Sequence, residues 1–240
     1  MSVSVLVVQN TSYGGPGRLG AWLGAAGLEL EVLRPYAGEE LPSGLGGRPL
    51  LVLGGGFLPD DDARAPWLAA ARRLVAQALA DGTPMLGICL GGQMLAQVAG
   101  GTVRASYGEP EYGSTAVHLR PEAADDPLLA GLGGTVRAIE RHVDAVTRLP
   151  AGAVWLASSD SCPYQAFRVG ERAWGVQFHP EAEARNIGAW DRTWLAGQGV
   201  DRDLLHARAV ADEEAAVATW SVFAERFAGV CRSAGRACRP

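Results

Sequence analysis

The 240-residue chain lacks a membrane-length hydrophobic run, a basic excess and a spaced set of cysteines. No apolar stretch approaches the roughly 20 residues that a helix needs to cross a bilayer. Its 21 Lys and Arg residues against 26 Asp and Glu residues give a net charge of −5. This balance provides no excess positive charge for binding nucleic acid or an anionic lipid surface. We therefore expect neither a nucleic-acid partner nor a membrane partner.

Cysteine is scarce, and its four positions show no paired metal-binding spacing: Cys89, Cys162, Cys231 and Cys238. The first ten residues form a strand pattern without the charge and cleavage-site layout of a signal peptide. We therefore expect a cytoplasmic protein with reduced thiols, no metal site and no cofactor. Cys162, Cys231 and Cys238 are expected to be ordinary thiols.

What the chain does contain is an alternation of short apolar strands and helical patterns. Apolar, β-branched runs at Val3 to Val8 and Leu28 to Leu33 flank a helical pattern, which predicts a βαβ unit. Further buried strands are expected at 49–53 and 85–88. With 48% hydrophobic residues, the chain suits one α/β domain with a sizeable core.

The second half of the chain predicts shorter elements followed by a helical tail. We expect antiparallel strands at 155–159 and 165–169, a strand at 173–178, and one short helix at 126–130 within the loop 121–134. Beyond residue 181 the pattern is helical, with aromatic residues spaced three and four apart that are expected to pack the last helix onto the sheet: Trp220, Phe223 and Phe227. We therefore expect a domain over 1–185 with a helical extension, 186–240, packed on it.

The stretch Gly-Ile-Cys-Leu-Gly-Gly-Gln at 87–93 joins a predicted buried strand to a predicted helix. A cysteine on such a sharp turn is lifted out of the sheet, and the helix N-terminus favours its thiolate form. Gly87, Gly91 and Gly92 are expected to keep side chains away from an approaching substrate. The stretch is the cysteine version of the glycine-flanked nucleophile elbow.

A nucleophilic cysteine needs a base and a group that orients the base. The run Val-Gln-Phe-His-Pro-Glu at 176–181 supplies both at the end of an apolar strand. Because strand side chains alternate, His179 and Glu181 are expected to point to the same face.

Three glycines follow another buried strand: Gly54, Gly55 and Gly56. Glycines at the carboxyl end of a strand let the backbone approach a ligand and present free N–H groups. A tight turn is the structural alternative for this loop, just as Cys89 could be an inert core thiol, His179 a strand-end histidine and Glu181 a surface carboxylate.

Taken together, these motifs resemble those of the class I glutamine amidotransferases, and most of all the free-standing GMP synthase-like branch. The resemblance covers residues 1 to 181 and implies a three-layer, flavodoxin-like α/β fold with a mostly parallel central sheet and a small antiparallel portion. It also implies that Cys89, His179 and Glu181 form a triad releasing ammonia from glutamine.

The resemblance assigns further residues to the substrate site. It implies oxyanion contacts from the N–H groups of Gly55 and Leu90, and contacts of Gln93 with the amino-acid end of the substrate. The phrase His142-Val143-Asp144 resembles a His-Gly-Asp that lies beside the glutamine pocket, and 109–113 loosely resembles a Glu-Ile-Gly. Many relatives have histidine where this chain has Gly92, which predicts a more open pocket wall.

Three functions follow from the resemblance. The first is a glutaminase or amidotransferase subunit that supplies ammonia to a separate acceptor, with a synthetase partner subunit. The second is a γ-glutamyl peptide hydrolase, which uses the same triad on another γ-glutamyl amide. The third is a non-catalytic regulatory member of the fold.

Overall fold

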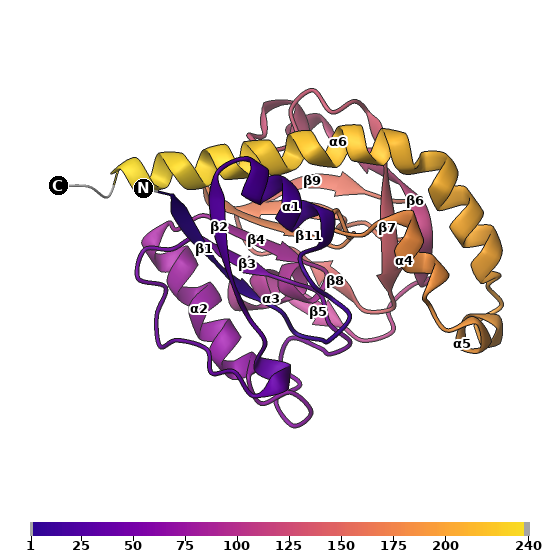
Figure 1. Ribbon diagram of the computed structural model, residues 1–240, viewed down its shortest axis with the longest axis horizontal. Helices are drawn as coiled ribbons and strands as arrows, with labels where there is room; N and C mark the ends of the chain where they lie inside the picture. The colour runs from indigo at the N-terminus through magenta and orange to yellow at the C-terminus, as the bar shows by residue number, and fades with distance from the viewer. Residues whose placement is uncertain (1, 238–240) are drawn as a thin grey trace.

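The computed structural model describes residues 2–237, and its central strands divide the hydrophobic core into two halves. Along β1 (Val3–Val8), Val5 and Val7 face one half, whereas Leu6 and Val8 face the other. The first half is covered by α1 (Gly17–Ala25) and α6 (Arg202–Ala237), and the second by α2 (Leu68–Asp81) and α3 (Leu90–Val98). The expected three layers are therefore present (Figure 1).

The main sheet has nine strands in the order β2-β1-β3-β4-β11-β10-β9-β6-β7. Its parallel part comprises β1, β2 (Leu28–Leu33), β3 (Leu50–Val52), β4 (Met85–Ile88) and β11 (Ala173–Val176). The antiparallel part comprises β10 (Ala166–Val169), β9 (Val154–Ser158), β6 (Glu111–Leu119) and β7 (Thr135–His142).

This architecture confirms the predicted α/β class. The antiparallel part is larger than expected, because three strands were not predicted from the sequence. They are β7 and the separate pair formed by β5 (Thr102–Arg104) and β8 (Ala145–Arg148). The short helix expected at 126–130 does not form: residues 127–130 are turns, and a 3₁₀ helix lies just before them at Pro121–Asp125. The buried Asp126 carboxylate accepts from the Leu128 N–H and from the Arg168 and Trp174 side chains.

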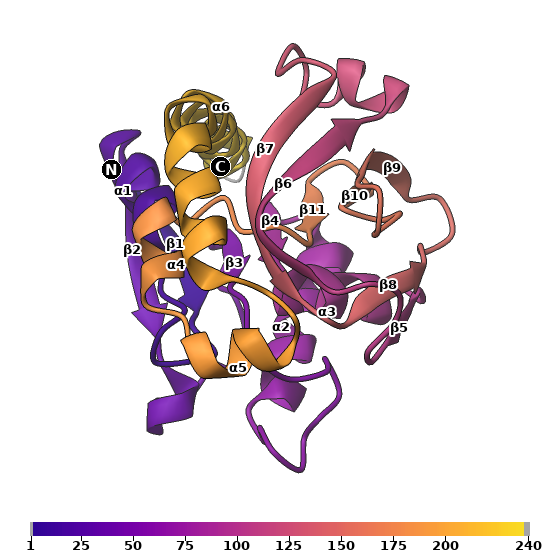
Figure 2. The same cartoon turned by 90° about the vertical axis from the view of Figure 1, so that its right-hand side faces the viewer.

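The C-terminal part contains α4 (Ala184–Gly188), α5 (Arg192–Gly197) and the 36-residue α6, which runs across the sheet (Figures 1 and 2). Trp220, Phe223 and Phe227 are fully buried in the first half of the core. The Trp220 ring lies 4.7 Å from the ring of Phe178, centroid to centroid. Within 2–237, no helix is both long and apolar enough to span a bilayer.

Candidate active site

Cys89 lies between β4 and α3 in a backbone conformation that is rare for a residue with a side chain. Its φ is 50° and its ψ is −107°, and its N–H donates to the Val176 carbonyl at 2.7 Å. A non-glycine residue at such a φ is strained, and strain of this kind concentrates at functional sites. The side chain is buried, and the residue lies on the strand-to-helix turn that the sequence predicted, at the start of α3.

The glycines around Cys89 serve packing rather than substrate access, which corrects the sequence-based expectation. A Cβ on Gly91 would lie 2.1 Å from the Val52 carbonyl oxygen, and a Cβ on Gly87 would lie 2.3 Å from that of Gly91. A Cβ on Gly92 would lie 2.8 Å from the Val176 carbonyl oxygen. Gly92 therefore packs closely against the backbone of β11.

His179 and Glu181 meet in a hydrogen bond of 2.7 Å between Nδ1 and Oε1. The sequence argument for this contact was wrong in one respect, because β11 ends at Val176 and the two residues do not alternate along a strand. Instead, the His179 N–H donates to the Ile139 carbonyl at 2.8 Å, so that β7 fixes the loop.

The protonation of His179 depends on its two neighbours. Burial on its own lowers the pKa of His179, but the Glu181 carboxylate and the Cys89 side chain raise it well above its usual value. The second ring nitrogen, Nε2, is buried and has no hydrogen-bond partner among the described residues. An imidazolium in this position carries a transferable proton close to Cys89.

The glycine loop after β3 reaches this pair. A Cβ on Gly54 would lie 3.0 Å from Cε1 of His179 and 3.5 Å from Cβ of Cys89. A Cβ on Gly55 would lie 2.8 Å from the Leu90 side chain, whereas the nearest atom to one on Gly56 is the Tyr13 hydroxyl at 3.9 Å. Gly54 thus leaves the space that the histidine occupies, Gly55 packs on Leu90, and Gly56 lies farther out.

A chain of amide side chains leads to the Cys89 sulfur. Gln177 Nε2 donates to Sγ at 3.4 Å, and Gln93 Nε2 donates to Gln177 Oε1 and to the Asp144 carbonyl, both at 3.0 Å. The sequence analysis expected Gln93 near the site but gave Gln177 no role. A polar residue at the end of an apolar strand was the signal that could have identified it.

Gly17 and Arg18 brace the His179 loop, and no local sequence signal identifies them. Gly17 has a φ of 48°, and a Cβ there would lie 2.2 Å from the Glu181 carbonyl oxygen. Arg18 Nε donates to the Pro180 carbonyl at 3.1 Å, and its Nη1 pairs with Glu213 of α6 at 3.0 Å. Sequence separations of 162 and 195 residues explain why the motif search missed these contacts.

The segment His142-Val143-Asp144 lies beside the Gln93 and Gln177 side chains, but the His142 side chain points toward Glu111. His142 Nδ1 lies 3.1 Å from the Asp144 carbonyl oxygen, and its Nε2 lies 3.0 Å from Glu111 Oε2. The Val143 carbonyl and the Asp144 carboxylate accept from the N–H groups of Tyr107 and Ser106. His142 is therefore a buried, hydrogen-bonded histidine.

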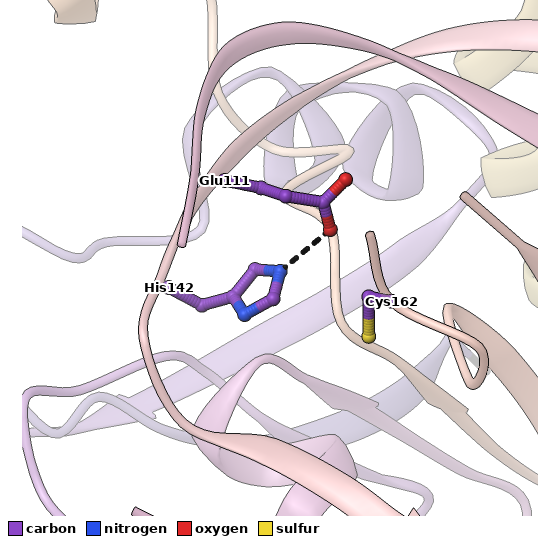
Figure 3. Close-up of side chains that lie close together, drawn as sticks. All are labelled: Glu111, His142 and Cys162. Atoms are coloured by element: carbon purple, nitrogen blue, oxygen red, sulfur yellow. Dashed lines mark hydrogen bonds and ion pairs between the residues drawn. The ribbon is translucent and has the colours of Figure 1, made fainter. Parts of the chain in front are cut away.

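Potential ligand atoms of Glu111, His142 and Cys162 lie within 4.8 Å of one another (Figure 3). Glu111 already accepts from His142 and, at 2.7 Å, from Gln165 Nε2. These contacts satisfy the cluster by hydrogen bonding, so we assign no metal to it. Cys162 and Cys231 are buried free thiols, whereas Cys238 lies outside the described residues.

The arrangement suits nucleophilic chemistry at an acyl carbon. It combines a cysteine at a helix N-terminus, a histidine held by a carboxylate, and a glycine loop that packs against this histidine.

Comparisons with known proteins point the same way. The family model for glutamine amidotransferase class-I matches residues 20–189. The chain is 38% identical over 147 residues to the glutamine-hydrolyzing GMP synthase of Porphyromonas gingivalis, covering 61% of this chain and 27% of that protein. It is 46% identical over 106 residues to one subunit of the glutamine-hydrolyzing GMP synthase of Sulfolobus acidocaldarius, covering 44% of this chain and 54% of that subunit.

The chain thus spans between about a quarter and about half of the length of these curated relatives. Among solved structures, a glutamine amidotransferase from Thermotoga maritima superimposes with a TM-score of 0.84 and 26% identity. The superposition covers 95% of this chain and 99% of that one. From its sequence match and its architecture, the chain belongs to the class I glutamine amidotransferase family.

Proposed function

We propose that this protein hydrolyses the γ-carboxamide of glutamine to glutamate and ammonia through a thioester on Cys89. One observation carries the proposal: the strained Cys89 and the hydrogen-bonded pair His179–Glu181 both lie next to the Gly54 loop. These residues come from three separate segments, and each satisfies one requirement of acyl-transfer catalysis.

In the first half-reaction, the Cys89 thiolate attacks the carboxamide carbon and a tetrahedral oxyanion forms. The N–H groups of Leu90 and Gly55 stabilise the oxyanion by several kcal/mol, as preorganised donors do in other acyl transfers. His179 gives the proton on Nε2 to the departing nitrogen, the C–N bond breaks, and ammonia leaves a γ-glutamyl thioester behind.

In the second half-reaction, His179 takes a proton from water, which attacks the thioester carbon. The carbon–sulfur bond then breaks, so that glutamate leaves and the thiol is restored. Glu181 orients the imidazole and compensates its positive charge throughout.

For the amino-acid end of glutamine we propose a site around Gln93 and 142–144. Both hydrogen bonds of the Gln93 amide nitrogen are used internally, whereas its carbonyl oxygen has no partner among the described residues. That oxygen suits the α-ammonium group. Backbone groups of His142, Val143 and Asp144 provide the other contacts.

We further propose that the ammonia passes to a separate acceptor enzyme. Support comes from the Sulfolobus acidocaldarius relative, whose name describes one part of a glutamine-hydrolysing synthase. A more open pocket at Gly92 would favour the γ-glutamyl peptide hydrolase alternative, and a Cβ at that position would meet the Val176 carbonyl oxygen of β11 at 2.8 Å. The non-catalytic alternative would be favoured by a missing triad residue, and all three residues are present.

The test measures ammonia and glutamate released from glutamine by the purified protein, alongside Cys89→Ala and a panel of γ-glutamyl peptides. We expect stoichiometric ammonia and glutamate from the native protein and none from Cys89→Ala. Cleavage of the peptides with glutamine left intact would replace the proposal by the hydrolase function. If no substrate is hydrolysed, even after a synthetase partner is added, the enzymatic proposal is overturned.

A further inference from the structure

Glu140 is a fully buried carboxyl group without a hydrogen-bond partner. It lies on β7, its side chain is 0% exposed, and neither of its oxygens is hydrogen-bonded within the described part of the chain. Burying an unpaired carboxylate costs several kcal/mol, so a group in this position is far cheaper to bury as the uncharged acid.

The donors around Glu140 are committed elsewhere. His142 Nδ1 faces a carbonyl, which can only accept, so Nδ1 carries a proton. Nε2 points at Glu111 at 3.0 Å and is 3.5 Å from Glu140 Oε2, and the Gln165 amide also donates to Glu111. Two carboxyl groups thus approach a single imidazole nitrogen, and two carboxylates that share one site do not both ionise readily.

Glu140 is also coupled to the proposed catalytic pair. The neighbouring Ile139 carbonyl accepts the His179 N–H, which ties β7 to the loop that carries the imidazole. Burial raises the pKa of Glu140 well above its usual value, with Glu111 and Cys89 adding to the effect and His179 and Gln165 opposing it.

The remaining titratable neighbour, Cys162, brings no charge at neutral pH. Burial raises the pKa of its thiol to about 12. Besides Cys162, the groups that face Glu140 within this cluster are Glu111 and His142.

Resting on the proposed function, we propose that Glu140 is a positioning residue whose carboxyl group stays uncharged in the working enzyme. In this state it fills the buried side of the active site without placing a second negative charge near the Cys89 thiolate and the oxyanion. Ionised Glu140 would oppose both charges and would hold the proton on His179. Activity should therefore fall at alkaline pH as Glu140 ionises.

The first test compares infrared spectra of the native protein, Glu140→Gln and a matched control, Glu171→Gln, which changes an exposed carboxylate. At neutral pH, subtracting the Glu140→Gln spectrum should reveal the C=O stretch of a protonated carboxyl group, and subtracting the control spectrum should reveal only ionised carboxylate bands. This readout requires no turnover. If the difference between the native and Glu140→Gln spectra contained only ionised carboxylate bands, the proposal would be overturned.

The second test measures kcat/KM for glutamine against pH in the same proteins. We expect the alkaline limb of Glu140→Gln to move to higher pH by about 1 unit, the scale of one buried like charge, while Glu171→Gln follows the native profile. Superimposable profiles for all three proteins would overturn the proposal, as would a stoichiometric metal ion in the purified protein. A protonated Glu140 band in a protein that stays inactive on glutamine when a synthetase partner is added would leave the carboxyl assignment standing and refute the glutaminase proposal.

Discussion

The brace formed by Arg18 gives the sharpest test of how the fold holds the His179 loop. Its side chain is only 6% exposed and connects three segments: the start of α1, the Pro180 carbonyl and Glu213 of α6. Replacing it by methionine keeps most of the aliphatic volume but removes the guanidinium. The backbone bond from the Arg18 N–H to the Glu181 carbonyl, 3.2 Å, is unaffected by the change.

The expected loss can be worked from these contacts. A charged donor on the buried Pro180 carbonyl contributes about 2 kcal/mol. The pair with Glu213 contributes about 0.5 to 1 kcal/mol, because the Glu213 side chain is 32% exposed and water screens it. Removing the buried charge offsets part of this lost stability, because a charged guanidinium is costly to bury. Burial accordingly lowers the pKa of Arg18. The net cost of Arg18→Met is about 2 kcal/mol.

Urea unfolding of the native protein, Arg18→Met, Glu213→Gln and the double variant measures these values. We expect Arg18→Met to cost clearly more than Glu213→Gln, because glutamine keeps one of the two acceptor oxygens that serve the Arg18 guanidinium and the Ala184 N–H, whereas methionine keeps no donor. The double variant should lose less than the sum of the two. A cost for Arg18→Met below about 0.5 kcal/mol, or strict additivity, would refute the brace.

Three further predictions concern stability. Gly91→Ala should cost about 2 to 3 kcal/mol in urea unfolding, because its Cβ would lie 2.1 Å from the Val52 carbonyl oxygen; a change below about 0.5 kcal/mol would contradict the packing. Trp220→Ala should cost about 3 to 5 kcal/mol by leaving a cavity against Phe178, and a shift in melting temperature of less than about 2 °C would contradict this. Because the folded state raises the pKa of Glu140, it retains that proton, so stability should fall with rising pH between the usual pKa of 4.5 and the raised folded value. Glu140→Gln should remove this fall of about 1.4 kcal/mol per pH unit, and parallel stability curves would rule it out.

The central part of the fold was predictable because its signals are local. Apolar runs located β1, β2 and β4, and the strand-to-helix turn at Cys89 was visible as a glycine-flanked cysteine. The glycine loop was visible after a buried strand, but its oxyanion role came from the family resemblance. Such features need only neighbouring residues to be specified.

What sequence reasoning missed depends on pairing between distant segments. β7 contains Arg137, Glu140 and Arg141, and its strand conformation follows from pairing with β6 along its whole length. The contact of His179 with Glu181 was expected from strand alternation, yet it results from the bridge to Ile139. Arg18 and Glu140 have no motif, and only the folded chain brings them to the site.

The most direct test of the account is acid quenching of the protein during reaction with glutamine, followed by mass spectrometry of the peptide that contains Cys89. The account predicts a γ-glutamyl adduct on Cys89 that accumulates before glutamate is released and is absent from Cys89→Ala, which should also release no ammonia. Ammonia release by Cys89→Ala at the native rate, with no adduct on the native peptide, would contradict it.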